Sequence, residues 1–373
     1  MKNTIRYLGI FSLILILAQC EPEDKADAIK VIEEPNNGGG TTGPTPYTLQ
    51  LPEHFALIGD PFIPSDNPLT EEGIALGKKL FFERKLSKNN QISCATCHKP
   101  QFAFNDEGNP VSFGVGGAAG VRNAMPLFNL GWVPRISSKF NWHGSATSLE
   151  EQAFEPVINP VEMQENWPDV VGKLQSDPVY PPLFEAAFET NIIDSNLVVK
   201  AISQFQRTLI SGNSRFDNYI KRRFGYQASG PDLTQQELRG YNLFVAEDKG
   251  DCAHCHADIG NPLMTNFAFV NNGLDAQPDS GLALVTKKAS DIGKFKTPSV
   301  RNLVFTAPYM HDGRFNTLRQ VVDFYVDSVQ QSPTLDGLMN KTRVMNNQER
   351  EDVVAFLKSM TDSSFVNNPA FRP

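Results

Sequence analysis

Two copies of one pentapeptide carry the residues best suited to chemistry in this chain of 373 residues. Cys-x-x-Cys-His is the attachment signature of c-type haem, in which two thiols form thioethers and the His ligates the iron. A thiol redox pair does not need the His, and a zinc site would have to draw its ligands from both motifs. We therefore predict two covalently attached c-type haems. Their attachment and ligating residues are Cys94, Cys97 and His98 in the first motif and Cys252, Cys255 and His256 in the second.

The chain around the two motifs repeats itself, which indicates that similar elements position both haems. Thr70 and Thr234 each stand at the start of an expected helix that leads into a motif. Downstream of the first motif, residues 121–123 read Val-Arg-Asn, and the same letters recur at residues 300–302.

Each half then has a second expected helix, which begins after a Ser or Thr cap. His143 precedes the first of these helices and His311 the second, each close to a glycine. Ser148 and Thr317 are the expected N-caps, each followed by Glu or Gln in the pattern of a capping box.

Two further amphipathic helices are expected, over residues 195–222 and 349–360, and the alternation typical of strands is scarce. The fold class that we predict is mostly α, with two cytochrome c-like haem domains related by internal duplication and with long loops. The N-terminal haem domain is expected over residues 51–225 and the C-terminal haem domain over residues 226–373.

The repeat also predicts a difference between the two haems. When Leu149 is aligned with Leu318, Pro156 in the first half takes the position of Tyr325 in the second. A phenolate oxygen is an iron ligand, whereas proline has no ligating group and interrupts the helix. We therefore expect Tyr325 to complete the coordination of the second haem iron, and the first iron to keep an open position.

Three residues near Pro156 would serve peroxide chemistry at an open iron. Cleavage of the O–O bond needs a proton moved between the two oxygens, and Glu162 is the candidate acid–base group. Gln152 would hydrogen-bond the oxygens, and Trp142 would pass an oxidising equivalent between the haems. Each also has a structural explanation: Trp142 as core, Gln152 as the partner of a neighbouring peptide group, and Glu162 as a surface carboxylate.

The N-terminal residues indicate that the chain leaves the cytoplasm. Residues 1–20 combine basic residues with an apolar stretch of signal-peptide length. Their last four residues, Leu-Ala-Gln-Cys20, resemble the lipobox of bacterial lipoproteins and predict a lipid anchor at Cys20, with an ordinary secreted protein as the alternative. Residues 21–50 predict a flexible tether. The expected location is the periplasm or the cell surface.

The formal net charge is −8, from 34 basic and 42 acidic side chains. Nucleic-acid binders carry a basic electrostatic footprint, so this balance argues against a nucleic-acid partner. An acidic surface suits a basic protein partner or a small neutral substrate.

Several motifs agree in order and spacing with one known family. The two haem motifs, the Arg122-Asn123 pair, the series Trp142, Gln152, Pro156 and Glu162, and the segment Thr306–His311 closely resemble the bacterial di-haem cytochrome c peroxidase family, which includes the methylamine-utilisation enzyme MauG. The resemblance covers residues 51–362. It implies that the series of four residues forms the active site.

The resemblance also implies a calcium ion between the domains. Its ligands would be the Asn123 side chain and the main-chain carbonyls of Thr306 and Pro308. Carbonyl and amide oxygens are the ligand type that calcium prefers. An ordinary contact between loops is the alternative for these three residues.

Three positions separate this chain from typical family members. Many of the peroxidases have, a little before the Arg-Asn pair, a His that blocks the first haem until the second is reduced, whereas this chain has Val115 in a glycine-rich loop. We therefore expect a first haem that is open without reductive activation. Tyr325 replaces a Met, as in MauG-like members, and should lower the potential of the second haem. Gly250 stands where MauG has the surface Trp through which it oxidises its partner protein.

Three functional hypotheses follow. The leading one is a peroxidase that reduces hydrogen peroxide to water at the N-terminal haem, with electrons relayed through the C-terminal haem from a small donor such as a cytochrome c or a cupredoxin. The second is MauG-like oxidation of a protein or small molecule. The third is a non-catalytic electron-transfer cytochrome, with Met310, Met339 or Met345 as a further iron ligand. Formation of a homodimer is an additional hypothesis.

Overall fold

The computed structural model describes residues 43–373, and these belong to one compact unit. The predicted signal peptide, the anchor at Cys20 and most of the tether lie outside the described residues, so these expectations stay predictions. No helix within residues 43–373 is both long and apolar enough to cross a membrane.

The first half has one helix before the first haem motif in the sequence and five after it, and the motif itself forms the short helix α2. They are α1 (Glu71–Phe81), α2 (Cys94–Cys97), α3 (Val133–Ile136), α4 (Leu149–Ile158), α5 (Trp167–Ser176), α6 (Tyr180–Phe188) and α7 (Ser195–Thr208).

The second half repeats this plan around its own haem motif, which contributes α10. Its helices are α8 (Arg215–Phe224), α9 (Gln235–Val245), α10 (Ala253–His256), α11 (Ala283–Thr286), α12 (Leu318–Asp327), α13 (Asn347–Ser359) and α14 (Ser363–Val366). Two short strands, β1 (Phe269–Val270) and β2 (Phe295–Lys296), pair in antiparallel fashion with Phe269 opposite Lys296. The mostly α fold with long loops is confirmed.

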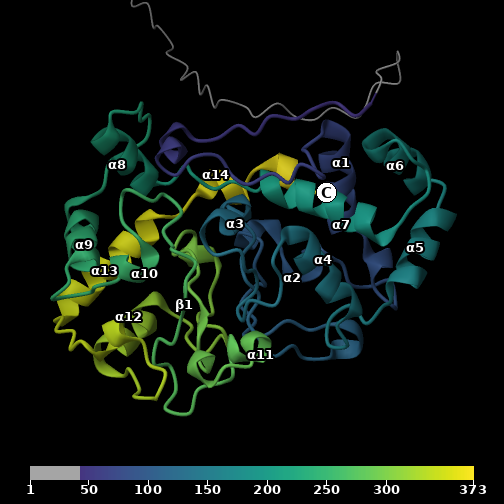
Figure 1. Cartoon of the computed structure of the whole chain (residues 1–373). Helices are drawn as coiled ribbons and strands as arrows, with labels where there is room; N and C mark the ends of the chain where they lie inside the picture. The colour runs from purple at the N-terminus through teal and green to yellow at the C-terminus, as the bar shows by residue number, and fades with distance from the viewer. Residues whose placement is uncertain (1–42) are drawn as a thin grey trace, which may run out of the picture. The chain divides into compact units, whose positions relative to one another are not determined.

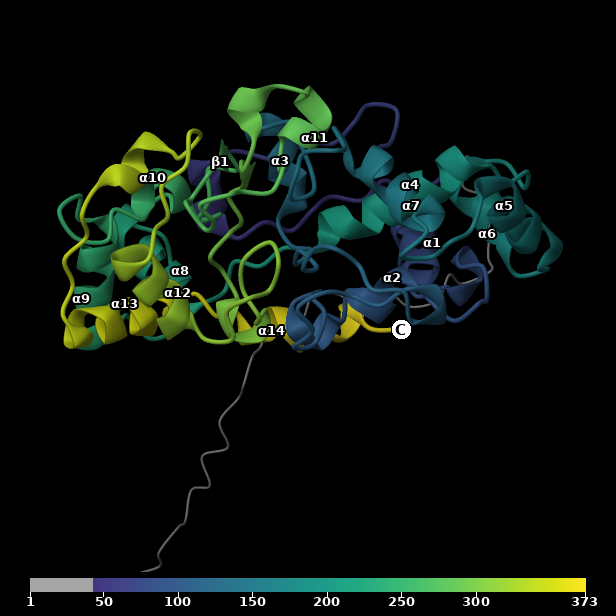
Figure 2. The same cartoon turned by 90° about the horizontal axis from the view of Figure 1, so that it is seen from below.

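The helices form two groups. Figures 1 and 2 show α1, α2, α4, α5, α6 and α7 on one side and α8, α9, α10, α12 and α13 on the other, with α3 and α14 between them. Each haem motif therefore lies within its own helical group.

The sequence repeat is present as two matching pairs of packed helices. α1 packs on α7 and α9 packs on α13, and each pair meets at a glycine. A Cβ on Gly77 would lie 1.8 Å from the carbonyl oxygen of Ala201, and a Cβ on Gly240 would lie 1.9 Å from that of Asp352. Any side chain at either glycine would push the two helices apart.

The hairpins between these helices correct one predicted equivalence. Residues 140–146 and residues 309–315 each form a loop closed by an antiparallel bridge between its first and last residue. In this register Trp142 matches His311, whereas the sequence had paired His143 with His311. The equivalence of the two histidines is therefore wrong, because Gly144 matches Gly313 in this register and His143 then matches Asp312.

The two Val-Arg-Asn segments are not equivalent either. Asn129 and Asn302 both have a left-handed backbone, with φ of 56° and 59°, and each caps a short 3-10 helix. Asn302 therefore matches Asn129, and the recurrence of residues 121–123 at 300–302 is a chance likeness of letters.

The helix expected over residues 195–222 is two helices, α7 and α8. The Asp362 carboxylate accepts hydrogen bonds at 3.0 Å from the main-chain N–H groups of Gly212 and Asn213, which lie in the break. Ser214 then caps α8. The periodicity of the segment is helical throughout, but a carboxylate distant in sequence stabilises the interruption.

The core consists of three hydrophobic clusters. One surrounds α1 and α7, one surrounds α9 and α13, and the third includes Trp132. Phe365 and Phe371, near the C-terminus, belong to the first cluster, where their ring centroids lie 5.8 and 6.1 Å from that of Phe104. The last residues of the chain thus return to the core of the first half. The domain boundary near residue 225 stays a prediction.

Candidate functional site

The first haem motif lines a cavity in the first half of the molecule. The walls come from α2, α4, α7 and the intervening loops. The lining includes the motif residues Cys94, Cys97 and His98 and the predicted active-site residues Gln152, Pro156 and Glu162. The fold therefore brings these six residues to one cavity, although their roles stay predictions.

Two lining residues of this cavity were missed by sequence reasoning. Ser112 Oγ and Gln206 Oε1 are buried and have no hydrogen-bond partner in the described structure. Buried polar atoms are normally satisfied, so both atoms fit an occupant that carries polar groups, as haem does. Single polar residues in a loop and a helix carry no sequence motif, and no pattern would have revealed them.

The two motif histidines are oriented in the same way. His98 Nδ1 donates to the carbonyl oxygen of Phe104 at 2.8 Å, and His256 Nδ1 donates to that of Pro298 at 3.1 Å. A carbonyl only accepts, so each ring keeps Nε2 without a proton and able to ligate a metal. Burial lowers the pKa of both rings, that of His256 to about 4, which favours this neutral form.

The buried surroundings of the thiols disfavour a redox pair. Burial raises the pKa of Cys94 to about 12 and that of Cys97 to about 11, whereas thiol redox chemistry needs a stabilised thiolate. All four described cysteines are free. Because the two motifs line separate cavities, they do not combine into one zinc site.

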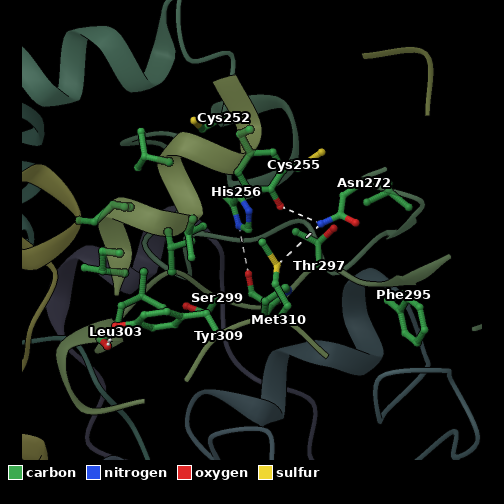
Figure 3. A pocket seen from close by; sticks show the side chains of 18 of the residues that line it. Cys252, Cys255, His256, Asn272, Phe295, Thr297, Ser299, Leu303, Tyr309 and Met310 are labelled. Atoms are coloured by element: carbon green, nitrogen blue, oxygen red, sulfur yellow. Dashed lines mark hydrogen bonds between the residues drawn. The ribbon is translucent and has the colours of Figure 1, made fainter. Parts of the chain in front are cut away.

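The second haem motif lines a larger cavity in the second half of the molecule. Figure 3 shows Cys255, His256, Asn272 and Met310 around one side of it, with Asn272 directed at Met310. The cavity also receives the predicted ligand Tyr325 and all three methionines considered as alternative ligands: Met310, Met339 and Met345.

Tyr325 and Pro156 occupy matching positions, as the repeat predicts. Each lies in a helix that begins at the aligned leucine, Leu149 in α4 or Leu318 in α12. The Tyr325 hydroxyl accepts a hydrogen bond at 3.0 Å from Nδ2 of Asn272, which sequence reasoning missed. Burial raises the pKa of Tyr325 to about 12, and the bond from Asn272 opposes that rise by stabilising the phenolate.

Glu162 is held at the wall of the first cavity. Its Oε1 accepts from Asn159 Nδ2 at 2.7 Å, and burial raises the pKa of the carboxyl group above its usual value. Its main-chain carbonyl accepts from the N–H of Val115 at 2.8 Å, and a Cβ on Gly114 would lie 2.3 Å from the same oxygen. The glycine-rich loop therefore packs directly on the segment that carries the carboxyl group.

Trp142 lines the second cavity, although its hairpin belongs to the first half. Its Nε1 donates to the carbonyl oxygen of Asn123 at 2.8 Å, and its ring lies edge-to-face with that of His311 at 6.5 Å between centroids. Trp142 is thus in contact with both halves of the molecule.

The three residues of the predicted calcium site share one cavity. Asn123, Thr306 and Pro308 line the second cavity. They offer an amide and two carbonyl groups, a set of oxygen donors that fits a hard cation. Asn123 Nδ2 donates to the carbonyl oxygens of Asn109 and Pro110, at 3.2 Å each, which fixes the orientation of the amide. Calcium binding stays a prediction.

Known proteins resemble this chain over most of its length. A family model described as di-haem cytochrome c peroxidase matches residues 71–224. Methylamine utilization protein MauG from Methylorubrum extorquens is 38% identical over 300 residues, which are 80% of this chain and 80% of that protein. The chain belongs to the di-haem cytochrome c peroxidase and MauG family. It is an oxidoreductase of that family, and its two Cys-x-x-Cys-His motifs are the haem motifs.

Relatives carry both functional names. Cytochrome-c peroxidase IdrP1 from Pseudomonas sp. strain SCT is 32% identical over 333 residues, which are 81% of this chain and 84% of that protein. The crystal structure of a MauG-like protein associated with microbial copper homeostasis has 33% identity and a TM-score of 0.77, and covers 87% of this chain and 99% of that one. The diheme peroxidase BthA from Burkholderia thailandensis shares the fold. Its structure matches with 24% identity and a TM-score of 0.68, and the match covers 80% of this chain and 88% of that one.

Proposed function

We propose that this protein reduces hydrogen peroxide to water in the first cavity, with two electrons delivered from a small redox protein by way of the second haem site. The observation that supports this most strongly is the grouping of Gln152, Pro156 and Glu162 with the first haem motif in one cavity. Haem bound there supplies an iron at which peroxide is reduced.

The protein's own contribution in the first cavity is proton handling. The Asn159 amide holds Glu162 Oε1, which leaves Oε2 to take a proton from peroxide and return it to the departing oxygen. The Gln152 amide orients peroxide, and Pro156 offers no side-chain ligand in the place where Tyr325 stands in the second half. The overall reaction consumes two electrons and two protons per peroxide and yields two waters.

The donor and the location complete the proposal. The donor is a small redox protein such as a cytochrome c or a cupredoxin, and Trp142, in contact with both halves, relays the electrons. The enzyme works in the periplasm or at the cell surface, tethered by a lipid at Cys20, and a calcium ion is bound at Asn123, Thr306 and Pro308.

The test is peroxide turnover by the holoprotein with the Glu162→Gln substitution. Loss of a positioned acid–base group should lower kcat/KM for peroxide by about 10²–10⁴-fold. Glu185→Gln, at an exposed position on α6, is the matched control and should leave turnover unchanged. Equal turnover in wild type and Glu162→Gln would contradict the proposal.

A second candidate function is oxidation of a partner protein or metabolite, as the MauG relatives suggest. Tyr325 and its Asn272 partner in the second cavity favour it. Gly250 counts against the MauG route, because a Cβ there would lie 2.6 Å from the carbonyl oxygen of Leu243, so a Trp does not fit. A holoprotein that oxidises reduced cytochrome c slowly, but introduces oxidised Trp or Tyr into a co-expressed protein, would favour this function.

A further inference from the structure

Lys296 is a buried cation that the proposed reaction does not use. It lies in β2 with 4% of its surface exposed and lines the second cavity. No Asp or Glu of residues 43–373 appears among its side-chain contacts, and burial lowers its pKa to about 7. Burying an ammonium without a counter-ion is costly, so its contacts must offset that cost.

The contacts of Lys296 converge on the hairpin that carries Trp142. Its Nζ donates to the carbonyl oxygen of Lys139 and lies 5.2 Å from the ring centroid of Phe140 and 4.8 Å from that of Phe267. Aromatic faces attract a cation. Its main-chain N–H donates to the carbonyl oxygen of Trp142 at 2.9 Å. Lys296 therefore binds the hairpin through both its backbone and its ammonium group.

The internal repeat gives Lys296 a counterpart, Asn123. The main-chain N–H of Asn123 donates at 2.8 Å to the carbonyl oxygen of His311, just as that of Lys296 donates to Trp142. Trp142 and His311 are equivalent in the two hairpins. Asn123 precedes Asn129 by as many residues as Lys296 precedes Asn302, and Asn129 and Asn302 are the equivalent left-handed residues.

The same register makes Lys139 the counterpart of Pro308, because each directly precedes its bridged hairpin. In the second half an ammonium group contacts the Lys139 carbonyl. At the repeat-related place, the Asn123 side chain and the Pro308 carbonyl are two of the three expected calcium ligands. One side of the repeat thus has a side-chain cation where the other side has oxygen donors suited to a metal cation.

We propose that the Lys296 ammonium group occupies the repeat-related counterpart of the calcium position. There it holds the Trp142 hairpin against the second half and raises the reduction potential of the second haem. The inference rests on the proposed function for the role of Trp142. When its ammonium group is charged, Lys296 favours the reduced form of a redox group bound in the same cavity, because reduction adds an electron beside the positive charge. Lys296 thereby opposes the lowering of potential expected from the Tyr325 ligand.

The test is a redox titration of the holoprotein, followed by the absorbance of each haem. Lys296→Met keeps the length of the side chain and removes the charge, and it should shift the midpoint potential of the second haem to more negative values. Lys296→Arg should retain most of the wild-type potential. Lys294→Met is the matched control, because the Lys294 ammonium is paired with Asp291, and it should leave the potential unchanged.

Hydrogen exchange of residues 139–146 reports the docking role separately. Lys296→Met should accelerate exchange in this hairpin, whereas Lys294→Met should not. If Lys296→Met loads haem poorly, Lys296→Gln removes the same charge and keeps a donor for the Lys139 carbonyl.

An unchanged potential of the second haem in the charge-removing variants would overturn the inference, as would a hairpin whose exchange is unaffected. A lysine that only fills space would give that result, with equal or higher thermal stability after replacement by Met. These readouts do not require turnover. Failure of the Glu162→Gln test together with a shifted potential would therefore reject the proposed peroxidase function and leave the role of Lys296 standing.

Discussion

The two cavities share several structural parts and present different residues at one matching helical position. Both have a Cys-x-x-Cys-His motif whose His donates through Nδ1 to a carbonyl, and both have a helix that begins at an aligned leucine. The first cavity then presents Pro156, and the second presents Tyr325 with its Asn272 partner. On the proposed function, the residue at this one position decides whether the helix offers the iron a side-chain ligand.

Transplanting that residue should have the largest effect. Pro156→Tyr places a phenol at the position that Tyr325 holds in the second half, and we expect peroxide turnover to fall to background. Low-temperature EPR of the oxidised holoprotein should change from one high-spin and one low-spin ferric signal to two low-spin signals. Pro156→Phe, which has the same ring without the oxygen, separates ligation from crowding: a high-spin signal should persist. Two low-spin signals already in the wild type would contradict the difference between the cavities.

Removing the phenol from the second cavity should have the next largest effect. Tyr325→Phe deletes the oxygen and leaves Asn272 without its acceptor, so the low-spin signal of the second haem should be lost or altered. Tyr309→Phe is the matched control, because that hydroxyl lines the same cavity but donates to the carbonyl oxygen of Leu303. A second-haem spectrum that is identical in wild type and Tyr325→Phe would indicate a different ligand, such as Met310.

The pH dependence of turnover should report Glu162. Its carboxylate must be unprotonated to take a proton from peroxide, so kcat/KM should fall as the pH drops through its pKa. Burial raises that pKa, and the fall should therefore begin at a higher pH than for an ordinary Glu of pKa about 4.3. Glu162→Gln should remove this acidic limb, and Glu185→Gln should keep it. An acidic limb that persists in Glu162→Gln would assign it to another group.

The smallest effects should come from the glycines at which the helix pairs meet. Gly77→Ala and Gly240→Ala each place a Cβ against a main-chain carbonyl, and each should lower the free energy of unfolding by about 1–3 kcal/mol. Gly172→Ala in α5 meets no neighbouring atom and should be neutral or stabilising by about 0.5–1 kcal/mol. Thermal unfolding measures all three. Unequal losses at Gly77 and Gly240 would show that the two halves tolerate separation of their helices differently.

Sequence reasoning succeeded where local signals repeat. The cap residues Thr70, Thr234 and Thr317 begin helices as expected, and the alignment of Leu149 with Leu318 placed Pro156 and Tyr325 in matching helices. These signals depend on hydrogen bonds within one turn, so the local sequence determines them.

Sequence reasoning failed where distant residues decide the structure. The break between α7 and α8 depends on Asp362, and no periodicity within residues 195–222 announces it. The match of Trp142 with His311 depends on the hairpin bridges, whereas residue identity alone favoured a match of His143 with His311. The sequence did not predict that three further residues line the cavities, because each is a single polar residue outside any motif: Asn272, Gln206 and Lys296.

The return of the C-terminal segment to the first core has a consequence for the order of assembly. Phe365 and Phe371 complete the cluster around Phe104, a residue whose carbonyl also orients His98. A chain that emerges from its N-terminus first cannot finish this core until its last residues have followed. The first haem motif is thus made early, but the core beside it is completed only after Phe365 and Phe371 have joined it.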